Sequence, residues 1–172
     1  MKKGKYLLAA FLISVFCVSS AAAKSIGIQV IQKNGALNEV HSSSYLIEES
    51  VLDSFFDYGY IVSNSPVCIS NGSNDESNER KTLNEAFEGQ LDYVIFITVS
   101  YKAEGSTNPQ ADYLTNIERI SWKMVDVITK RTLADATYNV GKVNPQNNSG
   151  DGIRKYTKNI AADIFDVVKS VR

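Results

Sequence analysis

Cysteine and histidine are scarce in this chain, and their scarcity excludes several kinds of site. The 172 residues include two cysteines, Cys17 and Cys68, and one histidine, His41. Zinc needs several Cys, His or carboxylate ligands at close spacing, so we predict no metal site. A catalytic triad would have to use His41, which precedes three serines at the expected start of a helix, where a solvated or capping role is favoured. We therefore expect no catalytic residues and no cofactor.

Basic clusters are missing as well. Removal of the first 23 residues would leave 15 basic and 19 acidic residues, a formal net charge of −4. Phosphate backbones and anionic lipid surfaces attract basic patches, so nucleic acid and anionic membranes are not expected partners. The run Gly150-Asp151-Gly152 lacks the third glycine of a dinucleotide-binding turn, and its aspartate would repel a phosphate, so we interpret it as the start of a helix.

The first 23 residues have the pattern of a secretory signal peptide. Three lysines precede an apolar run over 6–18, and the small residues Ala21 and Ala23 offer a cleavage site before Lys24. The apolar run is too short to span a bilayer stably. Cys17 leaves lipidation open as an alternative, but Phe16 stands where a lipidation site normally has a small residue, so plain cleavage is favoured. We expect a secreted, periplasmic mature chain with no transmembrane helix.

The spacing of hydrophobic residues predicts one domain over 24–172. Short β-branched or alternating apolar runs predict strands, and apolar residues at helical spacing predict helices. The expected order is β-α-β-α-β-β-β-α, which gives an α/β (α+β) fold with a mixed sheet of about five strands and about three helices. Expected strands lie at 25–32, 60–62, 93–99, 119–124 and 134–140, and expected helices at 42–59, 82–89 and 152–171.

Several individual residues have an expected place in this fold. Cys68, between Val67 and Ile69, should be a small buried apolar residue on a strand, and Trp122 should belong to the core. Three carboxylates recur at helical spacing in the first helix and are interpreted as its solvated face, with a cation site or acid-base pair as the alternative. They are Glu49, Asp53 and Asp57.

Two polar segments are the expected recognition loops. Residues 70–79 carry no apolar side chain and should form a mobile loop, with a capping box at 82–85 starting the next helix. Residues 144–150 are similarly polar. Recognition residues commonly lie on such loops, so we name six candidates for partner binding. They are Asn71, Asn74, Asp75, Glu76, Asn147 and Asn148.

Three segments resemble an envelope α/β module found at the N-terminus of TolB-type proteins and in CsgG-type and LpoB-type proteins. These are the opening strand and helix over 26–60, the helix-Gly-x-x-Asp-Tyr-Val-Ile junction over 86–95, and the strand-turn-strand over 125–133. The last is similar to the Asp-x-x-Thr-Gly-x-x-Leu hairpin of that group, in which the Asp caps turn amides. Lys130 stands here in place of the Gly, which implies either a strained residue or a different turn.

The resemblance implies a binding or scaffolding module without a conserved catalytic set. We expect a non-enzymatic accessory of the cell envelope whose partner is an envelope protein or a peptidoglycan-associated component. Two alternatives stay open: an extracytoplasmic hydrolase that uses loop carboxylates, and a small-ligand module, which would have a closed apolar pocket with convergent polar groups.

Overall fold

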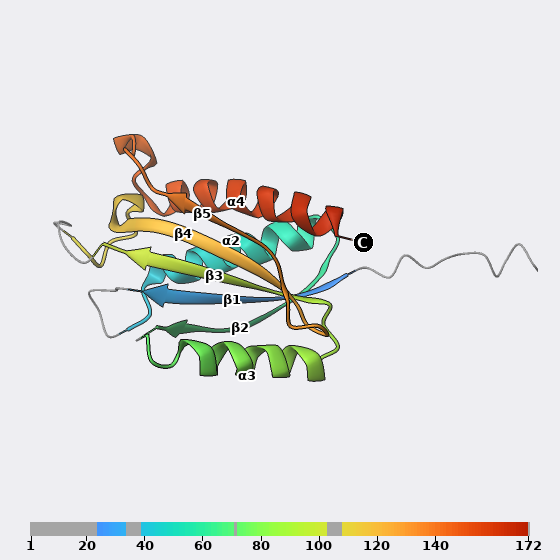
Figure 1. Cartoon of the computed structure of the whole chain (residues 1–172). Coiled ribbons are helices and arrows are strands. Elements are labelled where there is room, and N and C mark those ends of the chain that lie inside the picture. The colour runs from blue at the N-terminus through green and yellow to red at the C-terminus, as the bar shows by residue number, and fades with distance from the viewer. Residues whose placement is uncertain (1–23, 34–38, 71, 103–107, 172) are drawn as a thin grey trace, which may run out of the picture.

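The computed structural model describes residues 24–33, 39–70, 72–102 and 108–171. The signal peptide expected over 1–23 lies outside these ranges. In Figure 1 three long helices pack against one twisted sheet, in the order β-α-β-α-β-β-β-α that the sequence predicts. The strands are β1 (Ser25–Lys33), β2 (Ile61–Ile69), β3 (Tyr93–Tyr101), β4 (Ile117–Asp126) and β5 (Thr132–Asn139), and the helices are α2 (Ser42–Asp57), α3 (Asp75–Glu88) and α4 (Gly150–Ser170). Two short 3-10 turns, η1 (Leu114–Asn116) and η2 (Pro145–Asn147), precede β4 and α4.

The sheet is mixed, as expected. Its strand order is β2-β1-β3-β4-β5. β1 pairs in parallel with both β2 and β3, whereas β3-β4 and β4-β5 are antiparallel. The first strand of the chain is therefore interior to the sheet, and every residue of β1 between its two ends is buried.

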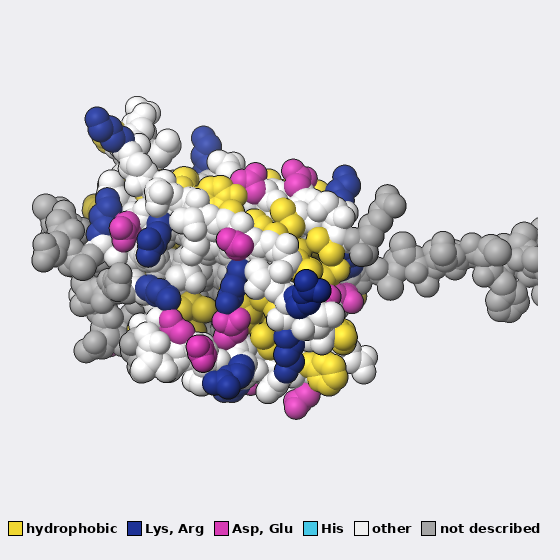
Figure 2. Space-filling view, in the orientation of Figure 1, with side chains coloured by type: hydrophobic (Ala, Val, Ile, Leu, Met, Phe, Trp, Pro, Cys, Tyr) yellow, Lys and Arg dark blue, Asp and Glu magenta, His cyan; other side chains and the backbone are white. Residues whose placement is uncertain are grey.

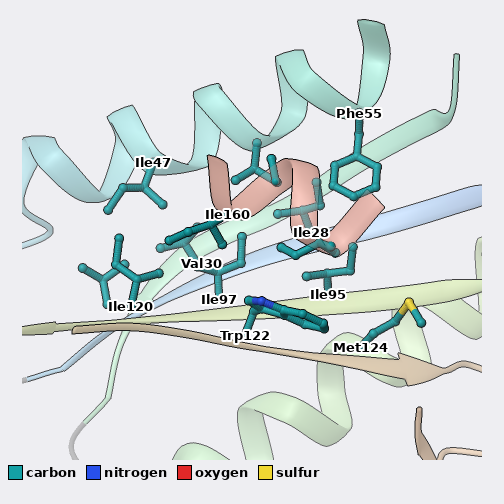
Figure 3. Close-up of a cluster of buried hydrophobic side chains, with 14 of the residues drawn as sticks. Ile28, Val30, Ile47, Phe55, Ile95, Ile97, Ile120, Trp122, Met124 and Ile160 are labelled. Carbon is teal, nitrogen blue, oxygen red and sulfur yellow. The ribbon is translucent and has the colours of Figure 1, made fainter. Parts of the chain in front are cut away.

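The two faces of the sheet are covered unequally. The larger core packs α2 and α4 against one face through residues such as Phe55 and Ile160 (Figure 3), and it includes Trp122, which confirms the expected core position. On the other face α3 buries Leu83 and Ala86 in a smaller cluster.

The helix α3 begins earlier than the sequence suggests. The expected loop over 70–79 and the expected helix start at Thr82 are wrong, because the helix starts at Asp75 and Thr82 is buried within it. Its first turns are held by polar contacts rather than by an apolar face. Asp75 pairs with Lys33 at 2.9 Å, and Glu79 pairs with Lys123 at 2.6 Å.

The edge strand β2 also departs from expectation. It extends from Ile61 to Ile69 and so includes Cys68, whose side chain is half-buried rather than fully buried. Pro66 lies in β2 where the register between β1 and β2 shifts. A proline and a bulge both interrupt the free edge of a strand, which protects it from pairing with another chain.

Two turns contain residues with positive φ, one after α2 and one in the hairpin between β4 and β5. Gly59, with φ +82°, follows the end of α2 as expected. Lys130 has φ +57°, so of the two alternatives for the hairpin the strained residue is correct. The carboxylate of Asp126 accepts hydrogen bonds from the amide and hydroxyl of Thr129, at 2.6 and 2.8 Å, as the hairpin resemblance implied.

Candidate functional site

The carboxyl ends of the parallel strands meet the N-terminus of α2 in a buried polar cluster. In open α/β sheets this is where ligands bind, at the point where successive helices switch from one face to the other. Here β1 lies between β2 and β3, with α2 and α3 on opposite faces. The cluster contains Gln32, His41, Ser43, Ser44 and Tyr101, all of them buried.

The side chain of Gln32 organises this polar cluster. Its carbonyl oxygen accepts hydrogen bonds from the His41 amide at 2.7 Å and from the Ser44 hydroxyl at 3.0 Å. Its amide nitrogen donates to the carbonyl of Glu39 at 3.0 Å. The hydroxyls of Ser44 and Tyr101 lie 2.9 Å apart, and burial raises the pKa of Tyr101 far above its usual range, so Tyr101 stays protonated. The polar groups at this end of the parallel strands are therefore hydrogen-bonded to one another, at the place where α/β proteins of this kind bind their ligands.

His41 has a structural role in this cluster. Its Nδ1 accepts a hydrogen bond from the amide of Ser43 at 3.0 Å, which makes His41 the N-cap of α2. Its Nε2 lies 2.8 Å from the carbonyl of Pro109, so the neutral tautomer with a proton on Nε2 satisfies both contacts. The capping interpretation is confirmed, whereas a solvated His41 is wrong because its ring is 5% exposed.

The carboxylate of Asp112 lies at the N-terminus of α2 and accepts hydrogen bonds from the first residues of the helix. It accepts hydrogen bonds from the hydroxyls of Ser42 and Ser43 at 2.6 and 2.8 Å, and it lies 4.0 Å from Nδ1 of His41. A negative charge near a helix N-terminus is stabilising. The order of groups differs from a Ser-His-Asp triad, because the ring nitrogens of His41 face a backbone amide and a backbone carbonyl rather than a serine hydroxyl.

The first group of expected recognition residues lies at the start of α3. Asn71 lies outside the described residues. Asn74 is the N-cap position of the helix, and Asp75 and Glu76 form its first turn. The hydroxyl of Ser70 and the ammonium of Lys33 hold the pKa of Asp75 below its usual range, in that order of effect. Asp75 thus fixes the helix start to β1 instead of belonging to a mobile loop.

The second group lies before α4 and also has structural contacts. Asn147 ends η2, and Asn148 accepts hydrogen bonds at its side-chain oxygen from the amide and hydroxyl of Thr115, at 2.9 and 3.0 Å. A Cβ on Gly152 would lie 1.7 Å from the carbonyl oxygen of Asn147. The N-cap of α4 is Ser149, so the helix-start interpretation of the glycine pair is correct. The first group is therefore anchored to β1 and the second to η1, so the two do not share a contact.

The remaining carboxylates noted in the sequence lie on the surface. Glu49, Asp53 and Asp57 are exposed on α2, which agrees with the solvated-face interpretation. Glu49 pairs with Arg154 of α4 at 2.6 Å. Within the described ranges no three His, Cys, Asp or Glu side chains are arranged to hold a metal ion. No helix of the described part is both long and apolar enough to cross a bilayer.

The best candidate for binding is a groove between β2 and α3 that sequence reasoning missed. It has a volume of about 360 Å³. Gly27, Val94 and Ala86 form a buried floor, whereas Ser63 and Glu85 on its walls are exposed. The floor is shaped by close packing, since a Cβ on Gly27 would lie 3.0 Å from Cδ1 of Leu91.

Small residues on neighbouring strands are the signal that could have revealed this groove. Gly27 pairs with Ser63 and Gln29 with Ser65, so both serines lie on the face of the sheet that α3 covers. Small side chains at paired positions leave space where larger ones would meet the helix. The pattern becomes visible only once the pairing of β1 with β2 is known.

A second, more polar hollow of about 440 Å³ lies on the same face above β3, β4 and β5, and its lining residues come from these three strands. Thr98, Ser121 and Thr137 line it together with Lys123 and Asp135. The side chain of Lys123 is already paired with Glu79. This hollow provides a matched comparison for the groove.

Comparison with known proteins assigns a family. Solved structures similar to the chain include a dodecamer of a PelC point variant from Paraburkholderia phytofirmans, with 10% identity, 86% of this chain and 90% of that chain covered, and a TM-score of 0.47. Lipoprotein GNA1162 from Neisseria meningitidis has 16% identity, coverages of 86% and 99%, and a TM-score of 0.39. A DUF330 protein from Xanthomonas campestris has 14% identity, coverages of 86% and 86%, and a TM-score of 0.41.

These similarities are too distant to carry an inference about function, and the specific TolB, CsgG or LpoB resemblance stays a hypothesis. No curated protein matches the chain. A family model does match, over residues 25–169, which include all five strands and nearly all of α4. The chain therefore belongs to the family whose description is "Uncharacterised protein".

Proposed function

We propose that the chain is a secreted, periplasmic, non-enzymatic module that binds another component of the cell envelope in the groove between β2 and α3. The groove itself is the observation that carries this proposal. Its buried floor and exposed polar walls provide apolar contact area together with hydrogen-bonding groups, and its volume of about 360 Å³ falls within the range of ligand pockets. The signal-peptide pattern over 1–23 supports the location. The role would be that of a binding, scaffolding or accessory part.

Two carboxylates with shifted pKa values, Asp75 and Asp126, favour binding over hydrolysis. A general acid at neutral pH needs a raised pKa. Both carboxylates have a lowered pKa instead. Hydrogen bonds from Ser70 and Lys33 lower the pKa of Asp75, and hydrogen bonds from Thr129 lower the pKa of Asp126. Each is also placed at a helix or turn terminus, where it accepts hydrogen bonds that stabilise the fold.

The groove can be tested by site-specific crosslinking in intact envelopes. A photo-crosslinking amino acid at position 63 probes the groove wall, and the same amino acid at position 137 probes the polar hollow above β5. We expect capture of one envelope protein or peptidoglycan-associated component from position 63 and none from position 137. Capture from position 137 alone would place the partner on the other hollow and contradict the proposal.

Filling the groove provides the second arm of the test. Ser65→Leu adds apolar volume to the groove, and Thr137→Leu adds it to the other hollow on the same face of the sheet. We expect Ser65→Leu to abolish the crosslink from position 63 and Thr137→Leu to leave it unchanged, with both variants folded by circular dichroism. Turnover of an envelope substrate by the parent protein, lost in a folded single carboxylate variant, would establish the hydrolase alternative instead.

A further inference from the structure

Large exposed apolar side chains gather at one end of the molecule. This is the end at which β1, β2 and β3 begin and α2, α3 and α4 finish, on the right of Figure 1. The same end carries several yellow apolar surfaces in Figure 2. The residues, with their exposed fractions, are Phe56 (72%), Tyr58 (41%), Ile61 (60%), Phe87 (56%) and Ile128 (72%), and we call them the apolar rim.

The rim residues belong to three segments that are separate in the sequence and lie at this end of the molecule. Phe56 and Ile61 flank the turn from α2 to β2, Phe87 lies in the last turn of α3, and Ile128 lies in the turn between β4 and β5. A hollow of about 450 Å³ separates Phe87 from Ile128. Exposed apolar side chains at the ends of several elements, with gaps between them, match a wide apolar surface such as a lipid bilayer better than a pocket that takes one side chain of a partner.

The chain enters the domain at the rim. The ammonium of Lys24 donates to the carbonyls of Val168 and Val171 at the end of α4, and the amide of Ser25 donates to Asp92 at 2.7 Å. Only residues 19–23 separate Lys24 from the apolar run over 6–18. Five residues span at most about 18 Å when extended, so before cleavage a bilayer that holds the apolar run is close to the rim.

Charges at this end are mixed rather than basic. Charged side chains of both signs lie near this end of the described chain, so attraction to an anionic surface is not expected. They include Lys24, Lys130, Arg131 and Lys169, and Asp57, Glu88, Asp92 and Asp126. A zwitterionic lipid surface matches this mixture of charges.

From these observations we propose that the apolar rim docks the domain on the surface of a zwitterionic phospholipid bilayer. Ile61, Phe87 and Ile128 enter the interface, and Lys24 and Lys130 lie at the level of the head groups. The groove between β2 and α3 then opens beside the membrane, because Leu91 contributes to both the groove and the hollow of the rim.

Fluorescent labels on single cysteines test this docking. Both native cysteines are replaced by Ser, and an environment-sensitive label is attached at Ile61→Cys or Ile128→Cys on the rim, and at Tyr45→Cys or Tyr113→Cys at the opposite end. The protein is purified from envelopes with whichever N-terminus export leaves, and mixed with phosphatidylcholine vesicles. We expect a shift to shorter wavelength, and quenching by spin-labelled lipid, at the two rim positions alone. A retained N-terminal segment would also bring the rim positions close to the vesicle, so substitution of the rim side chains is the deciding measurement.

Substitution of the rim gives the complementary measurement. Ile61→Ser or Ile128→Ser should each lower the vesicle partition coefficient of the mature protein about tenfold, whereas Tyr45→Ser should leave it unchanged. Equal shifts at all four label positions, or no shift, would overturn the proposal. A rim shift that depends on protein concentration without vesicles would assign the rim to a second copy. Ser65→Leu should still bind vesicles, which separates this result from that of the groove.

Discussion

The side-chain amide of Asn64 on β2 donates a hydrogen bond of 3.2 Å to the carboxylate of Glu48, which α2 buries to 9% exposure. Burial raises the pKa of Glu48, and the Asn64 bond offsets this only in part. The folded state therefore retains a proton on Glu48 at pH values where the unfolded chain has lost it. As the pH rises from the usual pKa of 4.5 through the raised value, the protein loses stability.

We therefore predict that Glu48→Gln stabilises the protein at neutral pH, because it removes a buried charge and keeps an acceptor for Asn64. The Tm should rise by about 2 °C at pH 7, and the gain should vanish below about pH 4, where Glu48 is protonated in both states. Thermal unfolding across this pH range measures the effect. Asp53→Asn, on the exposed face of the same helix, is the control and should change little. A gain that persists undiminished at acidic pH would contradict the explanation.

Lys130 should be replaceable by glycine with a gain in stability. Its φ of +57° costs a residue with a Cβ about 1–2 kcal/mol, and glycine gives back part of this in unfolded-state entropy. We expect Lys130→Gly to raise the free energy of unfolding by about 0.5–1 kcal/mol in denaturant titrations. Lys130→Ala keeps the strain and removes the contact of the ammonium with Asn84, so it isolates the backbone effect. Equal stability of the two variants would show that the turn relaxes without strain.

Gly152 should tolerate no side chain. Its Cβ would lie 1.7 Å from the carbonyl oxygen of Asn147, a backbone atom, so Gly152→Ala must displace η2 or the start of α4. We expect a loss of roughly 2 kcal/mol or more in the free energy of unfolding. Gly150→Ala is the matched control, because its Cβ would meet the flexible end of Leu46 at 3.2 Å and the Cβ of Asp112 at an ordinary contact distance of 3.8 Å. Similar losses for both would indicate that helix propensity, rather than this contact, sets the requirement.

The Cys68 thiol should react slowly in the folded protein and quickly in denaturant. Burial raises its pKa, and the negative charge of Asp75 raises it further. Because the thiolate is the reactive form, Asp75→Asn should speed labelling by a disulfide reagent at pH 8. Glu76→Gln, one position further along α3, is the comparison and should not. Unchanged labelling in Asp75→Asn would mean that access alone limits the reaction.

Hydrophobic periodicity predicted the element order and the mixed sheet, because strands such as β3 and helices such as α4 present continuous apolar patterns. It failed where polar contacts between distant segments decide the structure. The first turns of α3 depend on Lys33 and Lys123, 42 and 44 residues away. His41 can be buried because its polar groups have partners: its backbone amide donates to the side chain of Gln32, and its Nε2 lies within hydrogen-bond distance of the carbonyl of Pro109. The groove beside α3 depends on which residues of β1 and β2 face each other, and no local pattern contains that information.

The interior position of β1 imposes an order on folding. Ile26 at its start pairs with Val62 on one side and with Tyr93 on the other. The first strand to be synthesised therefore has to wait until β3 has been made, and its apolar side chains stay without native partners meanwhile. We expect a holding chaperone that recognises extended apolar segments to bind this strand above all. Slow synthesis of residues 70–92 would lengthen the time for which the strand is exposed.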